Sequence, residues 1–127
     1  MKILVMGGTR FVGKSLVQKL ISHNHEVDIF TRGNIPNPKG STSIKGDRND
    51  LEGLLKLKNI KYDIIFDISG RELSQTKILI ENIKHNFDRY VYVSSAGVYK
   101  NCQELPIDEN DPIDKDSRHK GKYETEK

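Results

Sequence analysis

The sequence of 127 residues contains one cysteine, no tryptophan and four prolines. Because Cys102 has no partner, an internal disulfide is excluded, which fits a reducing, cytoplasmic compartment, and we expect this residue to be an inert loop thiol. No apolar run approaches the roughly 20 residues of a membrane span, so we expect no membrane partner. Met1 and Lys2 lead straight into an apolar run, which leaves no room for a secretion signal. No residue is predicted to bind a metal.

Apolar residues make up 35% of the chain and charged residues 31%, with a net charge of +3. This length supports one domain with a real core but not two. Half of the residues from 100 to 127 are charged, so we expect a charged loop there, followed by the start of a helix near Arg118. The small positive charge is weak evidence for a nucleic-acid partner.

The stretch from Lys2 to Leu20 carries the most information. Ile3–Met6 reads as a buried strand, and Gly7, Gly8, Thr9 and Arg10 read as a tight turn. Apolar residues then recur at helical spacing, at Phe11, Val12, Leu16, Val17, Leu20 and Ile21. A strand, a glycine turn and a helix form a phosphate site, because the first helical N–H groups lack partners and the helix dipole favours an anion.

Two motifs overlap in this stretch. The pattern G-x-x-G-x-x-G runs from Gly7 to Gly13, with Arg10 at the middle glycine, and is typical of dinucleotide-binding folds. The pattern G-x-x-x-x-G-K-S runs from Gly8 to Ser15 and is a formally complete Walker A motif, in which Lys14 would reach the phosphates and Ser15 a magnesium ion. A run resembling a Walker B motif lies at 64–67.

We favour the dinucleotide interpretation over a P-loop NTPase. A P-loop prefers small residues between its glycines, whereas this turn holds Thr9, Arg10, Phe11 and Val12. Phe11 and Val12 fit the apolar face of a helix, with Gly13 allowing close packing on the sheet. Lys14 and Ser15 would then lie on the solvated side of that helix.

Further strands are expected at 26–30, 41–45, 62–68 and 90–93, and further helices near 51–55 and at 73–86, with Asp50 as the cap of the shorter one. Alternating strands and helices predict an α/β, Rossmann-like, doubly wound parallel sheet. We expect the strand order 3-2-1-4-5 and three layers, with helices on both faces.

In such a sheet, ligands bind at the carboxyl ends of the strands. The residues that follow the strands there are Gly7–Gly13, Arg32, Asp47, Ser69 with Gly70, and Ser95. An acid after the second strand would indicate NAD, but Arg32 can pair with a 2′-phosphate, so NADP is slightly favoured over NAD. Asp47 could accept a hydrogen bond from the adenine amino group.

Several segments resemble the extended short-chain dehydrogenase/reductase superfamily, and more narrowly its atypical branch of chloroplast stem-loop RNA-binding proteins and NAD-dependent epimerase/dehydratase-like bacterial proteins. They read GGTRFVG, GDRND, SGREL, YVSSAGVY and SRHKGK. The resemblance implies that residues 1–127 are a cofactor-binding domain, that a C-terminal substrate region is missing, and that the parent protein acts on a nucleotide sugar or similar small molecule. The alternative is an RNA-binding protein that kept the fold and lost the chemistry.

The superfamily's catalytic set is a serine or threonine followed by Tyr-x-x-x-Lys. By resemblance Ser95 takes the serine role, and a literal Tyr-x-x-x-Lys occurs at Tyr123 and Lys127. The usual continuation, Lys-Leu-x-x-Glu, is better matched when Lys122 is the active-site lysine, which places Arg118 at the tyrosine position. We favour this second register, in which the usual proton relay is absent.

The basic residues from Lys115 to Lys122 could contact phosphates of RNA or of a nucleotide sugar, although a solvated helix start explains them better. The segment from Arg118 to Lys127 has few apolar residues with which to dock. We therefore expect it to be mobile or held only by neighbouring molecules, and the chain alone to lack catalytic activity.

Overall fold

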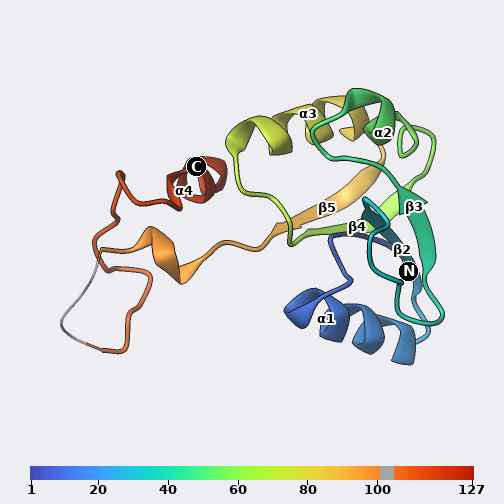
Figure 1. Ribbon diagram of the computed structural model, residues 1–127, viewed down its shortest axis with the longest axis horizontal. Coiled ribbons are helices and arrows are strands. Elements are labelled where there is room, and N and C mark those ends of the chain that lie inside the picture. Colours follow the sequence, from blue (N-terminus) through green and yellow to red (C-terminus); the bar gives the residue numbers. More distant parts are fainter. Residues whose placement is uncertain (101–104) are drawn as a thin grey trace.

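The computed structural model describes residues 1–100 and 105–127, so the expectation for Cys102 lies outside the described residues. Five parallel strands form one sheet in the order β3-β2-β1-β4-β5, which confirms the predicted topology (Figure 1). The elements are β1 (Lys2–Met6), α1 (Phe11–Ser22), β2 (Glu26–Thr31), β3 (Thr42–Lys45), α2 (Leu51–Leu55), β4 (Tyr62–Asp67), α3 (Leu73–Ile83), β5 (Phe87–Tyr92), the 3-10 helix η1 (Ala96–Val98) and α4 (Lys120–Glu126).

Helix α1 covers one face of the sheet, and α2 and α3 cover the other (Figure 1). Side chains alternate along β1, so Ile3 and Val5 pack with Val17 of α1, whereas Leu4 and Met6 pack with the leucines of α2 and α3. A strand that is buried on both faces needs a continuous apolar run, which is what β1 has. The predicted three-layer arrangement is confirmed.

Side chains at the helix starts explain where α2 and α3 begin. Asp50 accepts hydrogen bonds from the amides of Glu52 and Gly53, as its capping role predicted. At α3, Glu72 and Gln75 form a capping box: the Glu72 side chain accepts a hydrogen bond from the Gln75 amide, and the Gln75 side chain accepts one from the Glu72 amide. These caps hold the loops that follow β3 and β4 at the carboxyl edge of the sheet.

The predicted burial of Phe11 and Val12 is wrong. Phe11 is 87% exposed and Val12 67% exposed, whereas Gly13 and Val17 are the buried residues of α1. Phe11 and Val12 face solvent at the start of α1, while Gly13 in the same turn packs against Gly8. Helical periodicity identified the helix correctly but not the point at which its apolar face meets the sheet.

The expectation that residues 118–127 lack contacts within their own chain is also wrong. Helix α4 lies beside the start of α3, and the segment before it returns to η1 through a bridge between Tyr99 and Ile113 (Figure 1). The contact depends on backbone proximity rather than on apolar area, because Gly121 is buried against Arg71 and Glu72. A count of apolar residues therefore could not reveal it.

A buried polar cluster lies at the opposite edge of the sheet. Asp28 is 3% exposed, accepts a hydrogen bond from Tyr62 Oη at 2.9 Å and lies 3.7 Å from Lys2 Nζ. Burial and the neighbouring Asp28 raise the pKa of Tyr62.

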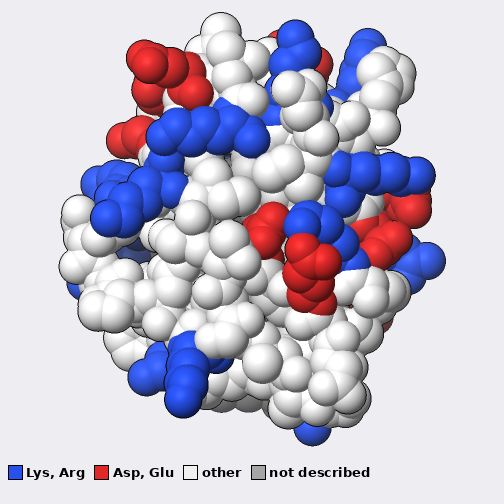
Figure 2. All heavy atoms as spheres, turned by 90° about the vertical axis from the view of Figure 1, so that its right-hand side faces the viewer, with Lys and Arg blue, Asp and Glu red and all other residues white. Residues whose placement is uncertain are grey.

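Figure 2 views the molecule from the side on which Figure 1 marks the N-terminus, and shows basic side chains in separate groups with acidic ones among them. That face presents no continuous basic surface.

No helix in the described part of the chain is long and apolar enough to cross a membrane.

Candidate functional site

A cavity of about 430 Å³ lies at the carboxyl ends of the strands. Six of the residues predicted to bind a cofactor line it: Gly7, Thr9, Arg10, Arg32, Asp47 and Ser69. The cavity is also lined by residues that were not predicted from the sequence, among them Arg48, Asn49, Arg71 and Gln75. The cavity thus carries four arginines; Arg48 is paired with buried Asp67, and the positive charge of the other three suits an anionic ligand.

The glycine turn brings the backbone to this cavity. Gly7 has φ +104° and Gly8 has φ +146°, values that L-residues with side chains rarely adopt. A Cβ atom on Gly13 would lie 3.0 Å from the Cα atom of Gly8, so Gly13 lets α1 approach the turn closely. Gly8 and Gly13 therefore shape the cavity without lining it.

The N-terminus of α1 is free to bind an anion. Arg10 occupies the cap position without a side-chain capping bond, and the first turn carries no acidic residue. The first amides of the helix thus keep unpaired N–H groups beside the cavity. Phe11 has φ +42°, a strained conformation for a bulky residue, of the kind that clusters at ligand-binding turns.

This geometry does not support the Walker interpretation. Helix α1 begins at Phe11, three residues before Lys14, and both Lys14 and Ser15 are exposed and do not line the cavity. Asp67, the acid of the Walker-B-like run, is fully buried and paired with Arg48. A magnesium ion would find no free carboxylate there.

Arg32 and Asp47 lie on the β2–β3 side of the cavity. Arg32 follows β2 directly and is exposed. The Asp47 carboxylate accepts hydrogen bonds from the amide of Asn49 at 2.9 Å and from its side-chain nitrogen at 3.0 Å. One carboxylate oxygen, Oδ1, takes both bonds, which fixes the orientation of Asp47 at the cavity wall.

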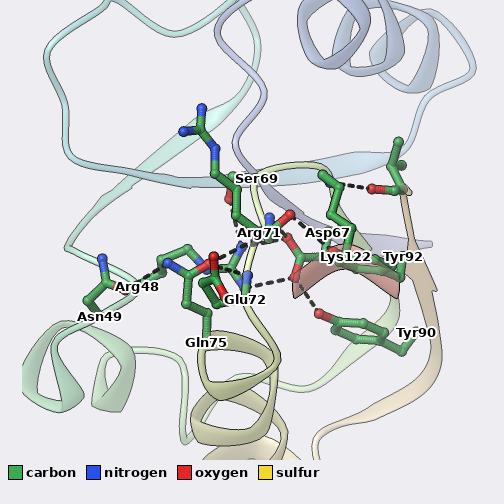
Figure 3. Close-up of polar contacts among 12 residues, drawn as sticks. Arg48, Asn49, Asp67, Ser69, Arg71, Glu72, Gln75, Tyr90, Tyr92 and Lys122 are labelled. Carbon is green, nitrogen blue, oxygen red and sulfur yellow. Dashed lines mark hydrogen bonds and ion pairs between the residues drawn. The ribbon is translucent and has the colours of Figure 1, made fainter. Parts of the chain in front are cut away.

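A buried network joins the loops that follow β3 and β4 (Figure 3). Arg48 donates to both carboxylate oxygens of Asp67, at 2.6 and 2.8 Å, and to Ser69 Oγ at 2.9 Å. Asp67 also accepts from the amide of Gly70 and from Tyr90 Oη. Burial lowers the pKa of Arg48, but its hydrogen bonds to Asp67 outweigh this effect and raise it. Burial, with the nearby Asp67, raises the pKa of Tyr90.

This network was not predicted from the sequence. The available signal was an aspartate that directly follows the apolar run of β4, because a buried carboxylate needs a partner. The sequence contains no indication that the partner is Arg48, which precedes it by 19 positions.

A second, smaller hollow lies past the end of β5 and is lined by Ser94, Ser95, Ala96, Val98, Tyr99 and Glu126. Ser95 Oγ accepts a hydrogen bond from the amide of Gly97 at 3.2 Å and thereby caps η1. Burial raises the pKa of Glu126. Ser94 Oγ is buried there without a hydrogen-bond partner among the described residues.

Lys122 is the α4 lysine that reaches the sheet. Its Nζ donates to the carbonyl of Val93 at 2.9 Å and lies 5.1 Å from the centre of the Tyr92 ring (Figure 3). Burial lowers the pKa of this lysine. Tyr123 and Lys127 line neither hollow, and Lys127 Nζ lies 5.2 Å from the Tyr123 ring. Arg118 is exposed and donates to His119.

Within residues 1–100 and 105–127, no three His, Cys, Asp or Glu side chains gather in a group that could hold a metal ion.

Comparisons with known proteins agree with this geometry. The model of the NAD dependent epimerase/dehydratase family matches residues 3–127. The chain is 39% identical over 141 residues to the chloroplast stem-loop binding protein of 41 kDa b from Arabidopsis thaliana, covering 98% of this chain and 37% of that protein. It is 33% identical over 133 residues to a putative UDP-glucose 4-epimerase from Methanocaldococcus jannaschii, covering 87% and 44%. The chain thus spans less than half of these relatives.

Solved structures show the same fold. The UDP-glucose 4-epimerase of Thermus thermophilus, in complex with NAD, superposes with a TM-score of 0.85 at 19% identity, covering 99% of this chain and 49% of that one. The UDP-glucose 4-epimerase of Thermotoga maritima, with UDP-glucose, gives 0.83 at 20% identity, covering 99% and 49%.

Proposed function

This chain belongs to the NAD dependent epimerase/dehydratase family, and we propose that it is the nicotinamide-dinucleotide-binding part of a protein that acts on a nucleotide sugar or a similar small molecule. One observation carries the proposal: the uncapped start of α1 and the glycine turn border a cavity with four arginines. A bound nicotinamide ring would supply a hydride acceptor or donor.

The residues present fit such a cofactor. The amides of the Gly7–Gly13 turn would bind the pyrophosphate, with the side chain of Arg10 beside it. Asp47, held by Asn49, would accept from the adenine amino group. Arg32 would pair with a 2′-phosphate, so we propose a preference for NADP over NAD.

Replacing Arg32 with Ala tests the cofactor preference. A charge-assisted pair with a phosphate is worth about 1.5–3 kcal/mol, so NADPH affinity should fall roughly 10- to 100-fold. NADH affinity should change little. Arg89, which is exposed on β5 and does not line the cavity, provides the matched control in Arg89→Ala. An unchanged NADPH/NADH affinity ratio in Arg32→Ala would contradict the preference, and a wild-type protein that binds neither dinucleotide would contradict the function.

For the chemistry, we propose that Ser95 and Lys122 form the retained part of the superfamily's catalytic set. The position of Lys122 against β5 supports the register in which Arg118 replaces the tyrosine. Lys122, Tyr123 and Lys127 all lie outside both hollows, so the support for this register is the contact of Lys122 with the end of β5, whereas Lys127 lies over the ring of Tyr123 in its own helix. Lys122→Met should therefore weaken dinucleotide binding more than Lys127→Met, and the reverse order would favour the alternative register.

The second candidate function is RNA binding. It is favoured by the 39% identity to a relative whose name describes stem-loop binding, and by the arginine at the expected tyrosine position. The basic residues from Lys115 to Lys122 would contact phosphates. Measuring RNA retention and sugar-nucleotide turnover with the full-length protein distinguishes the two functions, since loss of the catalytic tyrosine predicts retention without turnover.

A further inference from the structure

The loops that follow β3 and β4 meet although their strands do not. In the order β3-β2-β1-β4 the two strands are three spacings apart, which is about 14 Å at the usual separation of neighbouring strands. Yet Arg48, after β3, and Asp67, at the end of β4, are 2.6 Å apart at their closest atoms. The loop from Gly46 to Asp50 therefore runs along the carboxyl edge of the sheet from β3 towards β4, and the side chain of Arg48 spans the remaining distance to Asp67.

The pair is built as a rigid fork. Two guanidinium nitrogens of Arg48 bind the two oxygens of Asp67, and one of them also binds Ser69 Oγ. The side chain of Arg48 is 10% exposed and that of Asp67 fully buried. A bidentate pair fixes direction as well as distance, and Lys cannot reproduce it.

A second link runs parallel to the first. Gln75 of α3 donates to Asn49 Oδ1 at 2.8 Å and accepts from the amides of Arg71 and Glu72 (Figure 3). Asn49 is also the residue whose nitrogens bind Asp47. Arg48 thus attaches this short loop to the end of β4, and Asn49 attaches it to the first turn of α3, beside Asp47 in the cavity lining.

Stability alone does not account for this arrangement. A buried ion pair is often no more stabilising than apolar residues of similar volume, because both charges lose their hydration. The charge of Arg48 is also neutralised by Asp67, which leaves it little attraction for a ligand phosphate. What the pair provides is a fixed loop at the edge of a binding cavity.

We propose that Arg48, through its fork with Asp67, is a positioning residue for the dinucleotide: it holds the Gly46–Asp50 loop so that Asp47 faces the adenine group. This inference rests on the proposed function. The position of this loop matters because displacing a binding group such as Asp47 by about 1 Å removes much of its contribution to ligand affinity.

Two variants of the full-length protein test the proposal. Arg48→Met alone would leave Asp67 as an unpaired buried charge, so the first variant is Arg48→Met with Asp67→Asn, which removes both charges. The second is Arg48→Lys, which keeps the charge but loses the fork. The control replaces an exposed pair remote from the cavity, Lys61→Met with Asp88→Asn. Denaturant titration checks that each protein is folded.

The readouts are NADH and NADPH affinity and amide hydrogen exchange of the Gly46–Asp50 loop. Both Arg48 variants should bind the dinucleotides about tenfold more weakly, and the loop amides should exchange faster while those of β1 do not. In an Asp47→Ala background the same changes should cost less than about twofold, because a residue that acts through Asp47 has nothing left to position.

Wild-type affinity in both folded Arg48 variants, or losses that simply multiply with that of Asp47→Ala, would overturn the positioning role while leaving the proposed function intact. A wild-type protein that binds neither dinucleotide would overturn both.

Discussion

Replacing Gly121 with Ala tests whether α4 is docked on its own chain. In an unattached helix this change stabilises by about 0.5–1 kcal/mol, because Ala has the higher helix propensity. In the docked helix the new Cβ atom would lie 2.5 Å from Glu72 Oε2 and well inside 3.0 Å of the Arg71 carbonyl oxygen. A side chain can move aside, but the carbonyl belongs to the capped start of α3. The two situations therefore predict opposite signs.

The magnitude follows from the second contact. Forcing one methyl group against a fixed backbone typically costs about 1–3 kcal/mol, which exceeds the gain in helix propensity. We expect α4 to separate from α3 and Lys122 to lose its hydrogen bond to the Val93 carbonyl.

Amide hydrogen exchange over residues 120–126 measures this directly. Exchange in α4 should become faster in Gly121→Ala, while the strands keep their protection. Glu124→Ala is the matched control, since Glu124 lies on the exposed face of the same helix. If Gly121→Ala instead slowed exchange in α4, the helix would be undocked and the reasoning would be refuted.

Three further predictions follow from the fold. Tyr62→Phe should lower the free energy of unfolding by about 1–3 kcal/mol in urea titrations, because it removes the hydrogen bond to buried Asp28 and leaves that carboxylate with the more distant Lys2 ammonium, and an unchanged value would contradict that bond. Since the folded pKa values of Tyr62 and Tyr90 are raised, their stabilisation should be complete below pH about 10 and fall as pH rises beyond it. Urea midpoints from pH 8 to 11 should show this fall, less steeply in Tyr62→Phe, and a flat profile would contradict it. Lys14→Ala should leave dinucleotide affinity unchanged, whereas loss of a tight ATP–Mg²⁺ complex in this variant would revive the Walker interpretation.

The topology was predictable because its signals are local. Strands β1 and β4 are largely apolar runs bounded by turn residues, and parallel crossovers fix most of the arrangement that follows. Asp50 as a helix cap was predictable for the same reason, since a cap bonds to amides only two and three residues ahead. Strand ends were less exact: β5 begins at Phe87 rather than Tyr90, because its pairing with β4 starts opposite Tyr62.

The features that the sequence did not reveal depend on contacts between distant segments. Arg48 reads as an ordinary loop arginine until the sheet brings Asp67 to it. Gly121 reads as a poor helix residue until α3 comes close enough to exclude a side chain. Neither residue lies in a distinctive local sequence pattern. The partner of each comes from a segment distant in the sequence and is brought close only by the packing of the whole fold.

Arg10 shows how the glycine turn accommodates an arginine at the position of its middle glycine. The residue has φ −134° and ψ 154°, an ordinary extended conformation that any side chain can adopt. The positive φ falls one position later, on Phe11, where the backbone is strained although the side chain is largely exposed. The glycine is therefore dispensable at position 10 but not at Gly13, where a Cβ atom would press on the backbone of Gly8. Because Arg10 does not cap α1, the helix keeps its free amides and gains a positive charge beside them. In the proposed cofactor site, an arginine in this place would add positive charge beside the pyrophosphate instead of blocking it.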